Sequence, residues 1–423
     1  MFYRFLRSLA LFLRGHFFSR CSVIGEPPCE DGPVIVVANH PNYFLDPFLL
    51  ASVFRRELFF LAKSTLFTSI TSPLLRAAHL LPVYRMQDGG ENRAEKNRQV
   101  FASVIEKLEA RTGIALFPEG ISAGERKLHP IKTGASRMAL EAEAQNEFSL
   151  GVCIQPIGIT YARFGQFRSS VTLSFGRPIS VADFREEYHS NQRGAVQALT
   201  FSIEQGIREQ IVEVDEDRLL AEDIAEIYAT KDIGNHDLER FKEIALHLRK
   251  AREIPTSERI RIERRIDQFL RLRAQWGLDF DQPLEPPLSQ FQALCLTGPY
   301  LLGLLVVEPP YWLLRYIFRF QNNEAVAAGT RKLFIGAGVF GLWFGTLFSF
   351  LLFLSKSLTL SSSLLLVFIL CSIVVSWHGH RVRLFLLGLL RPGGASPVEM
   401  LRILRDELIN DLECYRSSSL DNS

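Results

Sequence analysis

The sequence predicts an α/β fold, in which a central sheet that is mostly parallel or mixed carries flanking helices. The first observation is a series of short apolar, β-branched runs that stop at polar or turn residues, which is typical of buried strands. The second is that helical stretches separate several of these runs, as connections between parallel strands require. The third is a chemical pattern, because histidine, arginine and glutamate stand where the runs end.

The first run, residues 34–38, stops at Asn39, His40 and Pro41. Proline cannot extend a strand ladder but suits the first turn of a helix, so we expect the strand to end at His40. The imidazole then lies at the carboxyl edge of the sheet, where α/β folds keep their ligand sites. Asp46 follows, and a carboxylate within reach can hold one ring nitrogen and leave the other free as a base. The alternative is an ordinary strand-to-helix turn with a surface histidine.

The remaining elements follow the same logic of apolar runs and amphipathic stretches. Further strands are expected at residues 58–62, 80–85, 113–117, 152–158 and 171–176, and helices at residues 47–55, 91–111 and 133–144. The strands other than the first deliver Lys63, Arg85, Glu119 and Pro156 to the same edge as His40.

Three residues suit the binding of an anion. The planar fork of Arg85 fits a phosphate dianion, although an isolated arginine at a strand end is usually just solvated. Gly120 lets the backbone turn tightly and approach a ligand. Lys132 stands where the helix 133–144 opens, and a helix N-terminus favours anions. One base with several cations and amides fits an anionic substrate that carries an attackable hydroxyl.

The chain outside the sheet divides by composition. Residues 1–20 predict an amphipathic helix suited to a membrane interface, because arginines are spaced among large apolar residues; a helix packed on the next domain is the alternative. Further regions are a charged helical region at 191–287 with a linker at 281–287, a membrane region at 288–395, and a surface helix with a polar tail at 396–423.

The membrane region predicts a helical hairpin. Residues 333–355 and 357–377 carry no charge, and each reaches the ~20 residues that a span needs. Residues 291–307 are uncharged but short, which suits a re-entrant or interfacial segment. Basic residues flank both outer ends of the hairpin, so by the positive-inside rule these ends face the cytoplasm. The sheet domain then lies on the cytoplasmic face of a bacterial inner membrane or of a membrane like the endoplasmic reticulum.

Composition argues against other partners. The net charge of +2 gives no strong basic bias, so nucleic acid is not an expected partner. The 6 cysteines are scattered without a Cys-x-x-Cys pair or a metal-ligand spacing with histidines, so we expect no metal site. The oligomeric state stays open.

Four ordered motifs resemble those of the glycerolipid acyltransferase family, which includes the glycerol-3-phosphate and lysophosphatidic acid acyltransferases. They are Asn39-His40 with Asp46, Leu81-Pro82-Val83-Tyr84-Arg85, Phe117-Pro118-Glu119-Gly120 and Gln155-Pro156-Ile157-Gly158. The motifs cover about residues 30–180, and we place the acyltransferase domain at residues 21–190.

Two departures from the common family spelling matter. The spacer between His40 and Asp46 holds five residues instead of four, so on a regular helix the two side chains would face different sides. Their pairing therefore needs a loop or bulge, or His40 outside the helix. Ile121 and Ser122 stand where Thr-Arg is common, which removes a cation that Lys132 is placed to supply. Both departures resemble the branch of fungal glycerol-3-phosphate/dihydroxyacetone-phosphate acyltransferases and related bacterial proteins.

The resemblance implies a membrane-bound enzyme of phospholipid synthesis. It moves a fatty acyl group from an acyl thioester, acyl-CoA or acyl carrier protein, to a hydroxyl of glycerol 3-phosphate or dihydroxyacetone phosphate; lysophosphatidate is the alternative acceptor. No metal or bound cofactor is implied, since the thioester is a co-substrate. A thioesterase or lipase, which would use water or a Ser nucleophile, is an alternative of a different class. A non-catalytic membrane scaffold is the remaining alternative.

The resemblance also assigns roles to the residues. His40 is the base and Asp46 orients it. The phosphate side is formed by Arg85, Glu119, Gly120 and Lys132, and other parts of the site by Asn39, Lys63, Pro118 and Pro156, with Pro156 lining the acyl side.

Overall fold

The computed structural model describes residues 2–18, 20–25, 32–85, 92–125, 127–161, 170–211, 256–275, 288–319, 325–389 and 397–420. The described residues up to 211 form one compact unit, and those from 256 onward belong to a second. The first unit holds the sheet and the second is helical throughout its described part.

The first unit is built on a mixed sheet of eight strands within the described residues. The order is β1-β7-β6-β2-β5-β3-β4, with β8 beside β6. β6 and β7 run antiparallel, as do β6 and β8, whereas all other neighbours are parallel. The strands are β1 (Arg20–Ile24), β2 (Val34–Ala38), β3 (Leu58–Lys63), β4 (Leu80–Val83), β5 (Gly113–Leu116), β6 (Cys153–Tyr161), β7 (Ser170–Phe175) and β8 (Ile179–Ser180).

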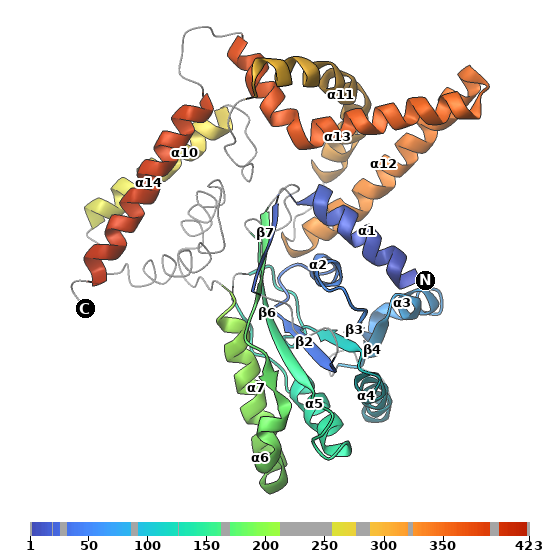
Figure 1. Cartoon of the computed structure of the whole chain (residues 1–423), viewed down its shortest axis with the longest axis vertical. Coiled ribbons are helices and arrows are strands. Elements are labelled where there is room, and N and C mark those ends of the chain that lie inside the picture. The colour runs from blue at the N-terminus through green and yellow to red at the C-terminus, as the bar shows by residue number, and fades with distance from the viewer. Residues whose placement is uncertain are drawn as a thin grey trace. The chain divides into compact units, whose positions relative to one another are not determined.

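Helices cover both faces of this sheet (Figure 1). They are α1 (Phe2–Phe17), α2 (Leu45–Val53), α3 (Ser72–Ala77), α4 (Arg93–Glu109), α5 (Gly134–Gln145), α6 (Arg185–Ser190) and α7 (Gln192–Arg208), with short 3₁₀ turns at Ser64–Leu66 and Val181–Phe184. Helices α5 and α7 contact β2 on one face, and α1 packs on α2 on the other. The predicted fold class is confirmed.

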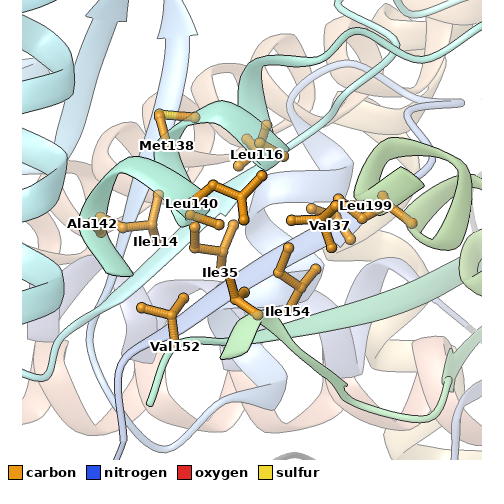
Figure 2. Close-up of a cluster of buried hydrophobic side chains, with 14 of the residues drawn as sticks. Ile35, Val37, Ile114, Leu116, Met138, Leu140, Ala142, Val152, Ile154 and Leu199 are labelled. Atoms are coloured by element: carbon orange, nitrogen blue, oxygen red, sulfur yellow. The ribbon is translucent and has the colours of Figure 1, made fainter. Parts of the chain in front are cut away.

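The main core lies between the sheet and helices α4, α5 and α7. Ile35 and Val37 of β2 point into it together with Ile154 of β6, and Leu140 of α5 and Leu199 of α7 pack against them (Figure 2). Successive strand residues face opposite sides, so Val34 and Val36 are buried on the other face. Burial on both faces explains why β2 reads as one continuous apolar run.

Two differences from the predicted strand bounds affect site residues. β2 ends at Ala38 instead of His40, because the side chain of Asn39 takes over the pairing with β6. Asn39 Nδ2 donates to the Ile159 carbonyl at 2.9 Å, and its Oδ1 accepts from the Ile159 amide at 2.7 Å. β6 runs on to Tyr161, so Pro156 lies within this strand and not at its end. Strands β1 and β8 had no counterpart in the prediction.

The first unit extends past the boundary predicted at residue 190. Leu199, Ile203 and Ile207 of α7 are buried in the same core as β2 and β5. The polar residues of α7 face away from this core, and they gave the stretch its charged appearance. Residues 212–255 and the expected linker at 281–287 lie outside the described residues.

The N-terminal helix packs on the sheet domain and leaves aromatic side chains exposed. On one side, the hydroxyl of Tyr3 accepts a hydrogen bond from the Leu58 amide of β3 at 3.0 Å, so α1 is packed on the domain. On the other side, Phe5 and Phe12 are 62% and 57% exposed. An exposed aromatic face suits the predicted contact with a membrane interface.

In the second unit, α10 (Thr256–Gln275) pairs with α14 (Pro397–Leu420). Phe269 of α10 is fully buried, and Arg265 forms ion pairs with Glu407 and Asp411 of α14. The expected charged helix thus has a partner helix. α14 also continues as a helix to Leu420, through the stretch predicted to be a polar tail.

Within the described part of the second unit, three helices are long and apolar enough to cross a membrane: α11 (Gln290–Arg319), and the segments Phe334–Ser355 of α12 (Ala325–Ser355) and Leu358–Ser376 of α13 (Leu358–Leu389). Lys356 turns the chain between α12 and α13 with a φ of 51°, which confirms the predicted hairpin.

Helix α11 is longer than predicted. The apolar stretch 291–307 does not end at Glu308, because the helix runs on through Pro309 and Pro310. Close packing supports it: a Cβ at Gly303 would overlap the Cys371 carbonyl of α13, so only glycine fits there. Prolines are tolerated inside apolar helices where neighbouring helices support the freed backbone groups.

Candidate active site

The connection from β2 to α2 places His40 outside the helix. Residues 39–44 form a loop that closes with a hydrogen bond from the Leu45 amide to the Asn42 carbonyl at 2.9 Å. Tyr43 within the loop has a φ of 33°, a conformation that is rare for residues other than glycine. The loop takes up the longer spacer, so Asp46 in the first turn of α2 points back toward His40. The expectation that the pairing needs a loop is confirmed.

His40 and Asp46 form a hydrogen-bonded dyad. His40 Nδ1 lies 2.8 Å from Asp46 Oδ2. Asp46 is fully buried, and two further donors hold its carboxylate: the Asn42 amide at 2.7 Å and the Tyr161 hydroxyl at 2.6 Å. Three hydrogen bonds replace the water that a buried carboxylate loses. The bond at Nδ1 leaves Nε2 as the ring nitrogen that can exchange a proton with a substrate.

Packing holds the imidazole ring of His40 in one plane. The ring stacks on Phe117 with a centroid distance of 4.0 Å and an interplanar angle of 13°. The His40 side chain is 18% exposed, so one part of the ring reaches solvent while Phe117 covers a face. This combination of fixed orientation and access is what a general base requires.

Glu119 braces the loops around His40 with its two carboxylate oxygens. Oε1 accepts from the His40 amide at 2.7 Å and Oε2 from the His129 amide at 3.0 Å. Burial raises the pKa of Glu119, although both backbone hydrogen bonds oppose this shift. Glu119 therefore links the loop of the first motif to the loop that follows the third motif, and it does so through hydrogen bonds to backbone amides.

The two candidate cations, Arg85 and Lys132, both lie close to Gly120. Arg85 Nη1 donates to the Gly120 carbonyl at 2.8 Å. A Cβ at Gly120 would lie 2.6 Å from Lys132 Nζ, and the residue has a φ of 67°, so both space and conformation favour glycine. The predicted grouping of Arg85, Gly120 and Lys132 is thus present in the structure.

Two residues that support the site, Asn97 and Tyr161, are absent from the sequence-based prediction. Asn97 of α4 clamps the backbone of Tyr84, accepting from its amide at 3.1 Å and donating to its carbonyl at 2.8 Å, which holds the adjacent Arg85 in place. Tyr161 reaches Asp46 from the end of β6. Strand alternation provides a signal for Tyr161, because Ile157, Ile159 and Tyr161 share the sheet face toward α2.

Part of the chain is similar to known proteins. Residues 20–160 match the family described as Acyltransferase. Glycerol-3-phosphate O-acyltransferase 2 of Saccharomyces cerevisiae is 37% identical over 109 residues, which cover 25% of this chain and 14% of the yeast protein. Glycerol-3-phosphate O-acyltransferase 1 of the same yeast is 31% identical over 137 residues, or 31% of this chain and 18% of the yeast protein. Residues 20–160 are thus similar to an acyltransferase domain.

The chain spans less than a fifth of the length of these two yeast relatives. Among solved structures, the 1-acyl-sn-glycerophosphate (LPA) acyltransferase PlsC from Thermotoga maritima aligns with a TM-score of 0.35 and 18% identity, over 49% of this chain and 78% of that one.

The acyltransferase domain does not bring every predicted residue to the dyad. Lys63 is exposed at the end of β3, and no hydrogen bond of the described residues links it to His40 or Gly120. Pro156 packs against α7, where a Cβ at Gly206 would lie 2.7 Å from its Cγ. Asn39 acts in strand pairing. Pro118 is buried, and its carbonyl accepts from the Lys132 amide at 2.9 Å, which shapes the loop around Gly120.

Proposed function

We propose that this chain is a membrane-associated glycerolipid acyltransferase that acylates a hydroxyl of a phosphorylated glycerol, preferably glycerol 3-phosphate or dihydroxyacetone phosphate. The observation that carries the proposal is the His40–Asp46 dyad with its 2.8 Å hydrogen bond and a base nitrogen left free by that bond. The acyl donor is a thioester, either acyl-CoA or acyl carrier protein. No metal or bound cofactor has a step in this reaction.

In the proposed reaction the acceptor itself supplies the nucleophile. His40 Nε2 takes the proton of the acceptor hydroxyl while its oxygen forms a bond to the thioester carbonyl carbon. The tetrahedral intermediate then collapses, the carbon–sulfur bond breaks, and the leaving thiolate takes the proton from Nε2. Asp46 keeps the ring in the tautomer with hydrogen on Nδ1 and stabilises the imidazolium between the two steps. No serine or cysteine nucleophile is needed.

The acceptor's phosphate belongs near Gly120 in this proposal. Arg85 and Lys132 both approach this glycine from different parts of the chain. A guanidinium and an ammonium close together suit a phosphate dianion, and they supply charge where the common family arginine is replaced by Ser122. This grouping favours a phosphorylated acceptor over an uncharged alcohol.

The membrane helices suit a lipid product and a lipid donor. α12 and α13 are apolar enough to cross a bilayer, and α1 presents exposed phenylalanines beside the acyltransferase domain. A fatty acyl thioester and a long-chain product both partition to such a surface, so attachment to the membrane keeps the site near its substrates.

An acceptor panel tests the proposal. The full chain is expressed in membranes that lack endogenous activity and is given radiolabelled acyl-CoA or acyl carrier protein with each acceptor. We expect a lysophosphatidate product from glycerol 3-phosphate, or its keto analogue from dihydroxyacetone phosphate, and none from the His40→Ala variant. Phosphatidate formed only from lysophosphatidate would reassign the acceptor. Free fatty acid as the sole product would indicate a hydrolase, and complete inactivity with both donors would favour a scaffold.

A further inference from the structure

A third residue, which lies outside the four sequence motifs, supports the His40–Asp46 dyad. Tyr161 lies in the last position of β6, is 1% exposed, and donates its hydroxyl hydrogen to Asp46 Oδ1 at 2.6 Å. The other oxygen, Oδ2, serves His40 Nδ1 at 2.8 Å and the Asn42 amide at 2.7 Å. The two carboxylate oxygens therefore have separate partners, and only one faces the imidazole.

A carboxylate with one oxygen unpaired can rotate about its Cβ–Cγ bond and exchange its oxygens. In a fully buried site, the unpaired oxygen would also lack the hydrogen bond that compensates for lost water. The Tyr161 hydroxyl removes both problems at once, since it fixes the carboxylate plane and satisfies Oδ1. Its short bond to an anion is of the charge-assisted kind.

The hydroxyl is held in the donor state. Burial raises the pKa of Tyr161 well above its ordinary value, and the neighbouring Asp46 carboxylate raises it further. The tyrosine thus stays protonated across the range in which a histidine changes charge. Its ring is fixed as well, since it packs on Phe18 with centroids 6.0 Å apart.

We propose that Tyr161 is a positioning residue of the active site, which acts on His40 only through Asp46. The proposal rests on the proposed function for its kinetic test but not for its spectroscopic one. It predicts that removal of the hydroxyl leaves the fold intact, because phenylalanine keeps the ring and its packing, while the hold of Asp46 on the imidazole changes.

The kinetic test compares Tyr161→Phe in the wild-type and Asp46→Asn backgrounds. In the wild-type background we expect kcat/KM to fall about tenfold, since a charge-assisted hydrogen bond within the dyad is lost. In the Asp46→Asn background the same substitution should cost less than about twofold, because its effect has no carboxylate to act on. Tyr188→Phe in α6, where the ring packs on Phe148, is the matched control and should leave kcat/KM unchanged. Equal losses in both backgrounds, or no loss in either, would overturn the proposal.

The pH profile separates positioning from a general structural effect. Without the Tyr161 hydroxyl, more of the negative charge of Asp46 is available to the imidazolium form of His40. The acid limb of kcat/KM should therefore move to higher pH in Tyr161→Phe and to lower pH in Asp46→Asn. A loss of activity with an unshifted acid limb would contradict the proposal.

A spectrum of the ring nitrogens gives a readout that needs no turnover. With ¹⁵N-labelled histidine in the full chain in detergent micelles, the His40 resonances are those that disappear in His40→Ala. We expect them to shift in Tyr161→Phe and to stay in place in Tyr188→Phe. Unshifted resonances in Tyr161→Phe would refute the inference even if acyl transfer is observed. A shift in an inactive protein would instead retain the inference and reject the proposed function.

Discussion

At the scale of single residues, the site depends on one buried carboxylate. Asp46 is fully buried yet accepts from His40, Asn42 and Tyr161, so its charge is shared by two donors from the β2–α2 loop and one from β6. A buried charge without such donors would be strongly destabilising. The arrangement therefore ties the fold of the β2–α2 loop to the chemistry of the imidazole.

Removal of the imidazole gives the first prediction. His40→Ala should lower kcat by about 10²–10⁴-fold, which is the usual contribution of a general base. The fold should remain, because Asp46 keeps two donors. Product formation and thermal unfolding of the purified variant check this, with His189→Ala on exposed α6 as the control. Retained turnover would contradict the assignment of His40 as the base.

The raised pKa of Glu119 gives a second prediction, which concerns how the stability of the fold depends on pH. Burial raises this pKa above its ordinary value, so in the window between the ordinary and the raised pKa the folded state binds the proton more tightly than the unfolded state. Stability from this residue is full at low pH and falls as pH rises through the raised pKa. Thermal unfolding in detergent should show this slope in the wild type.

The matched variant for that slope is Glu119→Gln. The amide cannot titrate, so the component of the slope due to this residue should vanish. One of the two backbone amides, of His40 or of His129, also loses its acceptor, which should lower stability by about 1–3 kcal/mol. An identical slope in both proteins would show that another group titrates.

At the scale of elements, one hydrogen bond connects the two departures from the common family motifs, which are the longer His40–Asp46 spacer and the serine at position 122. The longer spacer bulges at Tyr43, whose φ is 33°, and the Tyr43 amide donates to Ser122 Oγ at 3.0 Å. Ser122 occupies the position where the family commonly has arginine. The serine thus anchors the loop that the extra residue creates, and each departure is the structural complement of the other.

A third prediction tests this anchor. Ser122→Ala removes the acceptor and should cost about 1 kcal/mol of loop stability. We also expect kcat/KM to fall several-fold, because the same loop contains Asn42 and leads directly into Asp46. Ser122→Thr keeps a hydroxyl and should retain most of the activity. Ser190→Ala in α6 is an exposed serine control. Equal activity of the alanine and threonine variants would mean that the hydrogen bond does not position the loop.

Gly120 provides a fourth prediction at the same scale. An alanine there would require a positive φ, costing about 1–2 kcal/mol, and would push Lys132 Nζ from its place. If Lys132 contacts the acceptor phosphate, Gly120→Ala should raise the KM for the acceptor more than it changes the KM for the thioester. Gly151→Ala, also at a positive φ but in open space, controls for backbone strain alone. Equal effects on both KM values would argue against phosphate binding at this turn.

At the scale of the whole molecule, the prediction concerns topology. By the positive-inside rule, the charges that flank the hairpin predict that both of its outer ends face the cytoplasm. The exposed Glu308 in α11 argues against placing the middle of that helix in hydrocarbon. We expect residue 356 to face the opposite side of the membrane, and both ends of α11 to face the cytoplasm.

Single cysteines in a background without native cysteines check this topology. In intact cells, an impermeant maleimide should label Lys356→Cys, while Ser289→Cys and Arg319→Cys should react only after permeabilisation. Labelling of Ser289→Cys from outside would mean that α11 crosses the bilayer and that the N-terminal unit faces the exterior.

The sequence by itself determined the strands from β2 to β7, the hairpin of α12 and α13, and the grouping of His40, Arg85 and Gly120 at one edge. These features depend on local information, because the spacing of apolar residues and the residues that end a strand can both be recognised within a short stretch of sequence. Three elements were harder to predict: β1 lacks a strong apolar pattern, β8 has only two residues, and α7 carries its charges on the face away from the core.

Only the tertiary structure decided how the dyad is held. Tyr161 meets Asp46 across 115 positions of chain, and Asn39 meets Ile159 across 120. No local pattern encodes such pairs, since they exist only once β2 and β6 lie side by side in register. Because of the longer spacer, His40 and Asp46 could be in contact only if a loop separated them. The backbone at Tyr43 forms this loop with a positive φ, a conformation that sequence patterns do not predict for tyrosine.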